Sequence, residues 1–181
     1  MRTLMLALAA AASLCAQSAP SARPSRQEIA AMEKVIDQRL SRFSLERPVE
    51  VLGLTRGLYL DGFGAAFTAE VNLLPAVGVS PFRPALTKEE IARLREQKLN
   101  RLPQIRTLMQ DLLVAAAQSL DRLPANEQVV LALMLYSHSW EDSSGLPRLI
   151  QMQGRRDALL AVALERQPRS ALAQIVRVRE E

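Results

Sequence analysis

The sequence predicts an α+β fold, in which an N-terminal helix and a long kinked helix cover an antiparallel sheet of about four or five strands. Two runs with apolar residues at helical spacing and two runs with alternating or continuous apolar residues support this prediction. A length of 181 residues and a hydrophobic content of 49% suit a single folded domain, over 26–181, and exclude a disordered chain. Because aromatic residues make up only 4%, the core is expected to consist of aliphatic side chains and methionine.

The first 19 residues have the pattern of a secretory signal peptide. Arg2 supplies the positive charge, an apolar run extends from Leu4 to Leu14, and small residues follow. This run is shorter than the roughly 20 residues of a bilayer-spanning helix; the alternative is a buried N-terminal helix. Residues 20–25 have the composition of a linker. We therefore expect an exported chain that is periplasmic or secreted and does not span the membrane.

Cys15 is the single cysteine and lies inside this leader. Cleavage after it leaves a cysteine-free mature chain, which excludes disulfides, thiolate catalysis and cysteine-based zinc sites. A bacterial lipobox would place a leucine three residues before the cysteine, whereas here Leu14 directly precedes it. The sequence therefore argues against lipid anchoring at Cys15.

Two helices begin with capping boxes. The motifs at 25–28 (Ser-Arg-Gln-Glu) and 87–90 (Thr-Lys-Glu-Glu) each place a hydroxyl and a carboxylate where they can bond free N–H groups. Apolar residues at helical spacing follow both, which predicts helices over 26–43 and 88–121. The stretch between the predicted sheet and the second helix, 75–85, is rich in proline and is expected to be a loop.

The second helix contains two unusual residues. Pro103 lacks an N–H and clashes with the preceding turn, so we expect a kink or a break near 100–103. The apolar stripe could pair with a partner helix as a coiled coil, but Lys98 interrupts it. We therefore expect this helix to cover the sheet of its own domain.

Strands are predicted first within 49–74. The Asp61-Gly62 pair is a strong hairpin signal, because glycine accepts a positive φ. Over 66–73, apolar residues alternate with polar or small ones, which is typical of a sheet with one covered face.

The second half of the chain predicts the remaining elements. Residues 128–140 have apolar side chains on both faces, as in a central strand, and a turn follows at 141–145. A returning strand is expected at 149–153, a helix at 157–165 and a last strand at 175–179.

His138 is the only histidine, so any acid–base or triad chemistry would centre on it. Its neighbours Ser137 and Ser139 would point to the opposite face of a strand, which disfavours a triad. Tyr136, His138 and Trp140 recur at period two, and such a stripe could line a ligand groove. We expect instead that the stripe packs beneath a helix.

The candidate catalytic or metal-binding residues are His138, Asp61, Glu70, Glu141 and Asp142. Carboxylates and an imidazole could converge if the strands that carry them pair. The alternative is that Asp61 and Asp142 bond their own turns while Glu70 is solvated. No metal-binding or cofactor-binding motif is present, so we expect no metal and no cofactor.

For function, the sequence favours an exported cell-envelope protein that is a non-catalytic binding or assembly module. The alternative is a small hydrolase or metal-dependent enzyme centred on His138 and nearby carboxylates. The net charge of +4 comes from arginines interleaved with acids, without a nucleic-acid motif, so we expect no nucleic-acid partner. An unidentified envelope protein or ligand is the expected partner, and a homodimer through the sheet edge or the 88–121 helix is a further alternative.

Overall fold

The structure is a computed structural model that describes residues 23–44, 48–75 and 86–181. Its centre is a sheet with the strand order β1-β3-β4-β5-β6, and β2 also pairs with β3. The strands are β1 (Glu50–Val51), β2 (Arg56–Leu60), β3 (Gly64–Asn72), β4 (Gln128–Leu135), β5 (Leu149–Arg155) and β6 (Arg177–Glu180). The predicted signal peptide (1–19), half of the predicted linker (20–25) and most of the predicted loop (75–85) lie outside the described residues.

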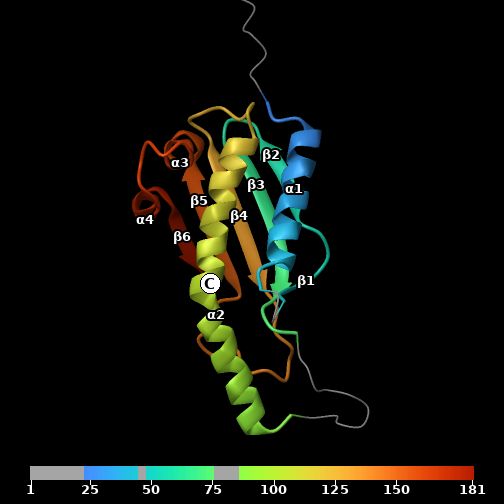
Figure 1. The fold of residues 1–181 in the computed structure, drawn as a ribbon. Coiled ribbons are helices and arrows are strands. Elements are labelled where there is room, and N and C mark those ends of the chain that lie inside the picture. The colour runs from blue at the N-terminus through green and yellow to red at the C-terminus, as the bar shows by residue number, and fades with distance from the viewer. Residues whose placement is uncertain (1–22, 45–47, 76–85) are drawn as a thin grey trace, which may run out of the picture.

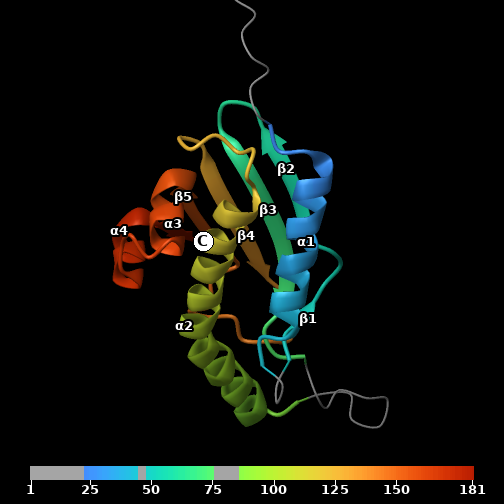
Figure 2. The ribbon, with the colours of Figure 1, turned by 45° about the horizontal axis from the view of Figure 1, so that its top comes forward.

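The helices lie on one side of the sheet, so the fold has two layers, as Figures 1 and 2 show. They are α1 (Arg26–Ser41), α2 (Lys88–Ser119), α3 (Arg156–Ala163) and α4 (Leu172–Ile175), with a 3-10 turn at Arg169–Ala171. The predicted α+β class is confirmed, as is the covering of the sheet by an N-terminal helix and a long helix. In Figure 1 the N-terminal part of α2 extends beyond the end of the sheet. Within the described residues, no helix is both long and apolar enough to cross a membrane.

Both predicted capping boxes are present. The Ser25 hydroxyl accepts from the Glu28 backbone N–H at 3.2 Å, and the Glu28 carboxylate accepts from the Ser25 N–H at 2.6 Å. Thr87 and Glu90 make the same pair of bonds. Helix α2 continues through Pro103 without a break, and in Figure 2 it changes direction along its length. Of the two expected effects of Pro103, the structure therefore shows the kink.

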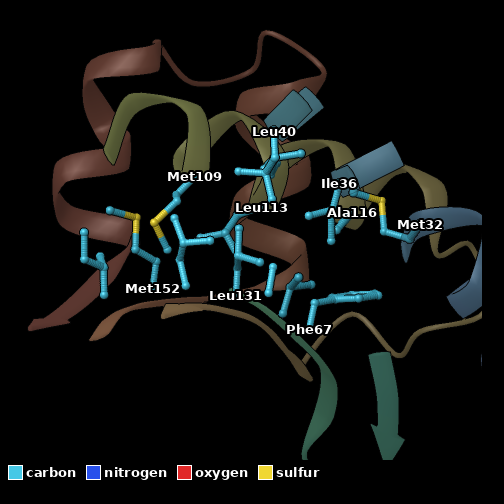
Figure 3. Close-up of a cluster of buried hydrophobic side chains, with 14 of the residues drawn as sticks. Met32, Ile36, Leu40, Phe67, Met109, Leu113, Ala116, Leu131 and Met152 are labelled. Atoms are coloured by element: carbon cyan, nitrogen blue, oxygen red, sulfur yellow. The ribbon is translucent and has the colours of Figure 1, made fainter. Parts of the chain in front are cut away.

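The hydrophobic core fills the space between the helices and the sheet, as Figure 3 shows. Alternate residues of the central strands supply its floor, and Phe67, Leu131 and Met152 are each at most 2% exposed. The helices contribute aliphatic and methionine side chains at helical spacing, among them Met32, Ile36, Leu40, Met109, Leu113 and Ala116. Each large apolar side chain that is fully buried contributes about 1.5–3 kcal/mol, so this layer accounts for much of the stability.

Two features of the sheet differ from the prediction. Strands β3 and β4 are parallel, because α2 carries the chain back to the end of the sheet where β3 starts before β4 begins. Strand β4 ends at Leu135, not at 140, because its neighbours end at the same level: β3 ends at Asn72 and β5 begins at Leu149. The N–H of Tyr136 still donates to the Val71 carbonyl at 2.8 Å, and the pairing stops there. Residues 136–148 therefore form a loop, which places His138 outside the sheet.

Glu165 ends α3 in a left-handed conformation, with φ of 56°. The backbone N–H groups of Arg166 and Gln167 both donate to the Ala161 carbonyl, which closes the helix end. Non-glycine residues in this region carry strain, so Glu165→Gly is expected to stabilise the protein by about 0.5–1 kcal/mol. Thermal unfolding measures this change. Glu165→Ala is the control, because it removes the charge and keeps the strain; a glycine variant no more stable than the alanine variant would contradict the interpretation.

Candidate functional site

A polar cavity lies at the end of the sheet where the parallel strands β3 and β4 both finish. Its volume is about 370 Å³, and loop 136–148 forms most of its wall. The carboxyl ends of parallel strands are a common place for ligand sites, because the loops that follow the strands gather there. Among the residues that line it are Glu70, Tyr136, His138, Glu141 and Arg148.

The structure brings together three of the five predicted site residues. Glu70, near the end of β3, lines the cavity with His138 and Glu141. Asp61 lies in the β2–β3 hairpin turn, beside the start of β4 and therefore at the opposite end of the sheet. Asp142 is in the same loop as His138 but is held in a turn. Within the described residues, no group of three or more metal-ligating side chains is close enough to hold a metal ion.

The three rings of the predicted stripe contact one another. Tyr136 and His138 meet edge to face with centroids 5.0 Å apart, and the rings of His138 and Trp140 stack at 5.1 Å. The Tyr136 hydroxyl is 3.3 Å from Nδ1 of His138. Tyr136 is 38% exposed, so the expected packing beneath a helix is wrong for this residue. The rings stabilise the loop, and two of them border the cavity.

Glu141 forms a buried ion pair with Lys98 of α2. Both side chains are only 2% exposed, and the Lys98 ammonium donates to Oε2 of Glu141. Oε1 of Glu141 is buried and has no hydrogen-bond partner among the described residues. The pair ties loop 136–148 to the extended part of α2. Sequence reasoning missed this role of Lys98, although its signal was visible as a lysine interrupting an apolar stripe.

The two aspartates have structural partners. Oδ1 of Asp142 accepts from the Ser144 hydroxyl and from the Ser144 backbone N–H at 2.9 Å, as the turn alternative expected. These bonds, and more weakly Arg95, lower the pKa of Asp142. Asp61 instead pairs with Arg23 at 2.7 Å on the surface.

The bonds to Ser144 give a pH prediction. Because the pKa of Asp142 is lower in the folded protein, its contribution to stability is present above the ordinary value of 3.8. That contribution is lost as the pH falls through the lowered pKa. We expect Ser144→Ala to raise the pKa of Asp142 toward the ordinary value, as measured by NMR titration of the side-chain carboxyl carbon. An unchanged titration midpoint would contradict the assignment.

The arrangement at the cavity suits binding better than catalysis. A general acid–base pair needs the histidine and a carboxylate within hydrogen-bond reach of each other or of a substrate. The hydrogen bond that the structure gives His138 is to Tyr136, Glu141 is engaged by Lys98, and Asp142 by its turn.

A second candidate surface is the side of the sheet that faces away from the helices, which we call the open sheet face. Side chains alternate along each strand, so the residues between the core positions point to this face. The strand registers define its members as Glu50, Arg56, Leu58, Leu60, Ala66, Thr68, Glu70, Asn72, Gln128, Val130, Ala132, Met134, Leu149, Gln151, Gln153, Arg155, Arg177 and Arg179. No described helix or strand packs on it (Figures 1 and 2).

The open sheet face exposes large apolar side chains. Leu58 and Leu60 of β2 are 46% and 47% exposed, and Met134 of β4 is 43% exposed. Contiguous exposed apolar groups on a folded protein often mark an interaction surface. The β2 edge beside this face is protected, because Gly57 donates its N–H to Glu33 at 2.7 Å and its carbonyl accepts from Arg26 at 3.2 Å. These side chains of α1 disfavour strand addition at this point of the β2 edge.

Comparison with known protein families, curated proteins and solved structures gave no match to this chain.

Proposed function

We propose that the protein is an exported, non-catalytic binding or assembly module of the cell envelope, and that the open sheet face is its contact surface. The observation that carries the proposal is the exposure of Leu58, Leu60 and Met134 on a sheet whose other face packs against the helices. A sheet covered on one side only, with aliphatic side chains on the other, retains apolar area that a partner can bury.

Export is supported by the sequence of the leader. A basic residue, a short apolar run and small residues near 16–19 are the features that signal peptidases recognise. N-terminal sequencing of the protein purified from its native host tests this part. The proposal expects a mature chain that begins near residue 20, and recovery of intact Met1 in the cytosol would contradict it.

Site-specific photocrosslinking tests the contact surface. A benzophenone amino acid replaces Leu58 on the open sheet face in one variant and Leu164 in another. Leu164 is the matched control, because it is 53% exposed and follows α3 on the helix side. The proposal expects an adduct in intact cells from position 58 and little from position 164. Equal yields at the two positions would contradict it.

The second candidate function is an enzyme at the polar cavity, favoured by the gathering of Glu70, His138 and Glu141 around one space. A metal-screening thermal-shift experiment on the wild type and His138→Ala separates the two functions. A metal that stabilises the wild type alone would favour the enzyme. Equal responses of the two proteins would leave the binding module as the better proposal.

A further inference from the structure

We infer that the occupant of the open sheet face is an anionic lipid surface, to which the protein binds peripherally. This inference rests on the proposed function and names the class of partner. It follows from the charge on the face, from the polar side chains of β5 and from the position of the apolar side chains.

The charge of the open sheet face is strongly biased. Arg56 lies on β2, Arg155 on β5, and Arg177 and Arg179 on β6, while Glu70 of β3 and Glu50 of β1, which pairs with Asn72, are the two acids of this face. Two of the arginines have acidic neighbours, at 2.5 Å from Arg155 to Asp157 and 2.7 Å from Arg179 to Glu181. These pairs are well exposed, so they are weak and can exchange for another anion. The face therefore favours a negatively charged partner.

The same charges disfavour a second copy of the chain. In a face-to-face dimer, the four arginines of each copy would meet those of the other within one interface, and each copy would bring only two acids, Glu50 and Glu70, to balance them. Like charges brought together across an interface are costly. Within this one face, the arginines lie near both edges of the sheet, from β2 to β6. At about 4.8 Å between neighbouring strands, the complementary negative charge has to extend over roughly 19 Å, as it does in a layer of lipid headgroups.

On β5 the open sheet face is polar, which favours a hydrated partner. Gln151 and Gln153 bond each other at 3.4 Å, and Thr68 lies in the same cross-strand row as Gln151, with Ala132 of β4 between them. A dry protein interface would have to satisfy each of these groups. A peripheral protein keeps such groups in the hydrated headgroup region and inserts only its apolar side chains.

The apolar side chains are placed for such insertion. Leu58 and Leu60 lie next to the β2–β3 hairpin turn, in which Phe63 is 44% exposed. Arg155 of β5 is aligned with Leu60 of β2 across the sheet, with β3 and β4 between them. Apolar groups flanked by arginines combine the two attractions that bind proteins to anionic membranes.

Co-sedimentation with vesicles tests the inference on protein purified from its native host. We expect binding to vesicles of phosphatidylglycerol and phosphatidylcholine in equal amounts, weak binding to pure phosphatidylcholine, and weaker binding at higher salt. Arg177→Gln/Arg179→Gln should bind the anionic vesicles about 30-fold more weakly, at roughly 1 kcal/mol for each arginine. Leu58→Asn/Leu60→Asn should weaken binding at least about tenfold.

Matched control variants on the helix side of the molecule distinguish binding through the open sheet face from a general effect of net charge or hydrophobicity on vesicle binding. Arg93→Gln/Arg166→Gln removes the same net charge from exposed positions on the helix side, and Leu164→Asn removes an exposed leucine there. Both controls should bind like the wild type, and thermal unfolding should show all variants folded.

The outcomes distinguish this inference from the proposed function. If the controls weaken vesicle binding as much as the face variants do, or if the wild type does not bind anionic vesicles, the lipid inference is wrong. The proposed function survives that result if position 58 still crosslinks to a protein, or if light scattering shows a dimer that the face variants abolish. It fails together with the inference if position 58 gives no more adduct than position 164.

Discussion

Lys98→Met is expected to destabilise the protein by about 3–5 kcal/mol, because it leaves the carboxylate of Glu141 buried without its counter-charge. The effect should be largest in loop 136–148, which the pair ties to α2. Trp140 is the single tryptophan of the chain and is adjacent to Glu141, so its fluorescence reports on this loop. We expect its emission to shift to the red at lower urea concentrations than in the wild type, with global unfolding followed by circular dichroism.

The double variant Lys98→Met/Glu141→Leu supplies the stringent comparison. Removing both charges eliminates the desolvated carboxylate, so most of the lost stability should return. Arg155→Met is the exposed control; its pair with Asp157 is largely solvated, and its loss should cost at most about 1 kcal/mol. If Lys98→Met costs no more than Arg155→Met, the buried ion pair does not hold the loop.

Gly64→Ala is expected to have the second large effect, a loss of about 2–6 kcal/mol. Gly64 starts β3 at φ of 141°, and a Cβ there would lie 1.9 Å from the Gln128 carbonyl oxygen. The cost combines a strained backbone, at about 1–3 kcal/mol, with a collision that the neighbouring strand has to relieve, at a similar amount. Urea unfolding measures the loss.

Gly62→Ala is the matched control for Gly64→Ala. Gly62 also has a positive φ, of 75°, but a Cβ there would meet no atom within 4 Å. Its substitution should therefore cost only the backbone strain, about 1–2 kcal/mol. Equal losses for the two variants would show that the close approach of β3 to Gln128 is not a constraint on the fold.

The local elements were predictable because their signals are local. Ser25 and Thr87 identified the two helix starts, since a capping box needs only four consecutive residues. The alternation over 66–73 identified the covered and uncovered faces of β3, whose burial follows the same period.

The features that the sequence did not predict depend on distant contacts. The parallel pairing of β3 and β4 depends on where α2 returns the chain, and the end of β4 depends on where its neighbours end. Lys98 and Glu141 are 43 residues apart, so neither residue alone identifies the other as its partner. The candidate site was predicted in part, because Glu70, His138 and Glu141 do share a cavity. The exposure of the open sheet face was not predicted, because it depends on all the helices lying on one side of the sheet.

The occupancy of the open sheet face in the cell tests the account most directly. Single cysteines at positions 58 and 164, in a Cys15→Ser background, are labelled with a maleimide in intact cells and in the purified protein. The account predicts slower labelling at position 58 in cells than in the purified protein, with equal rates at position 164. Equal rates at position 58 in the two settings would show that nothing covers the face, and would contradict the account.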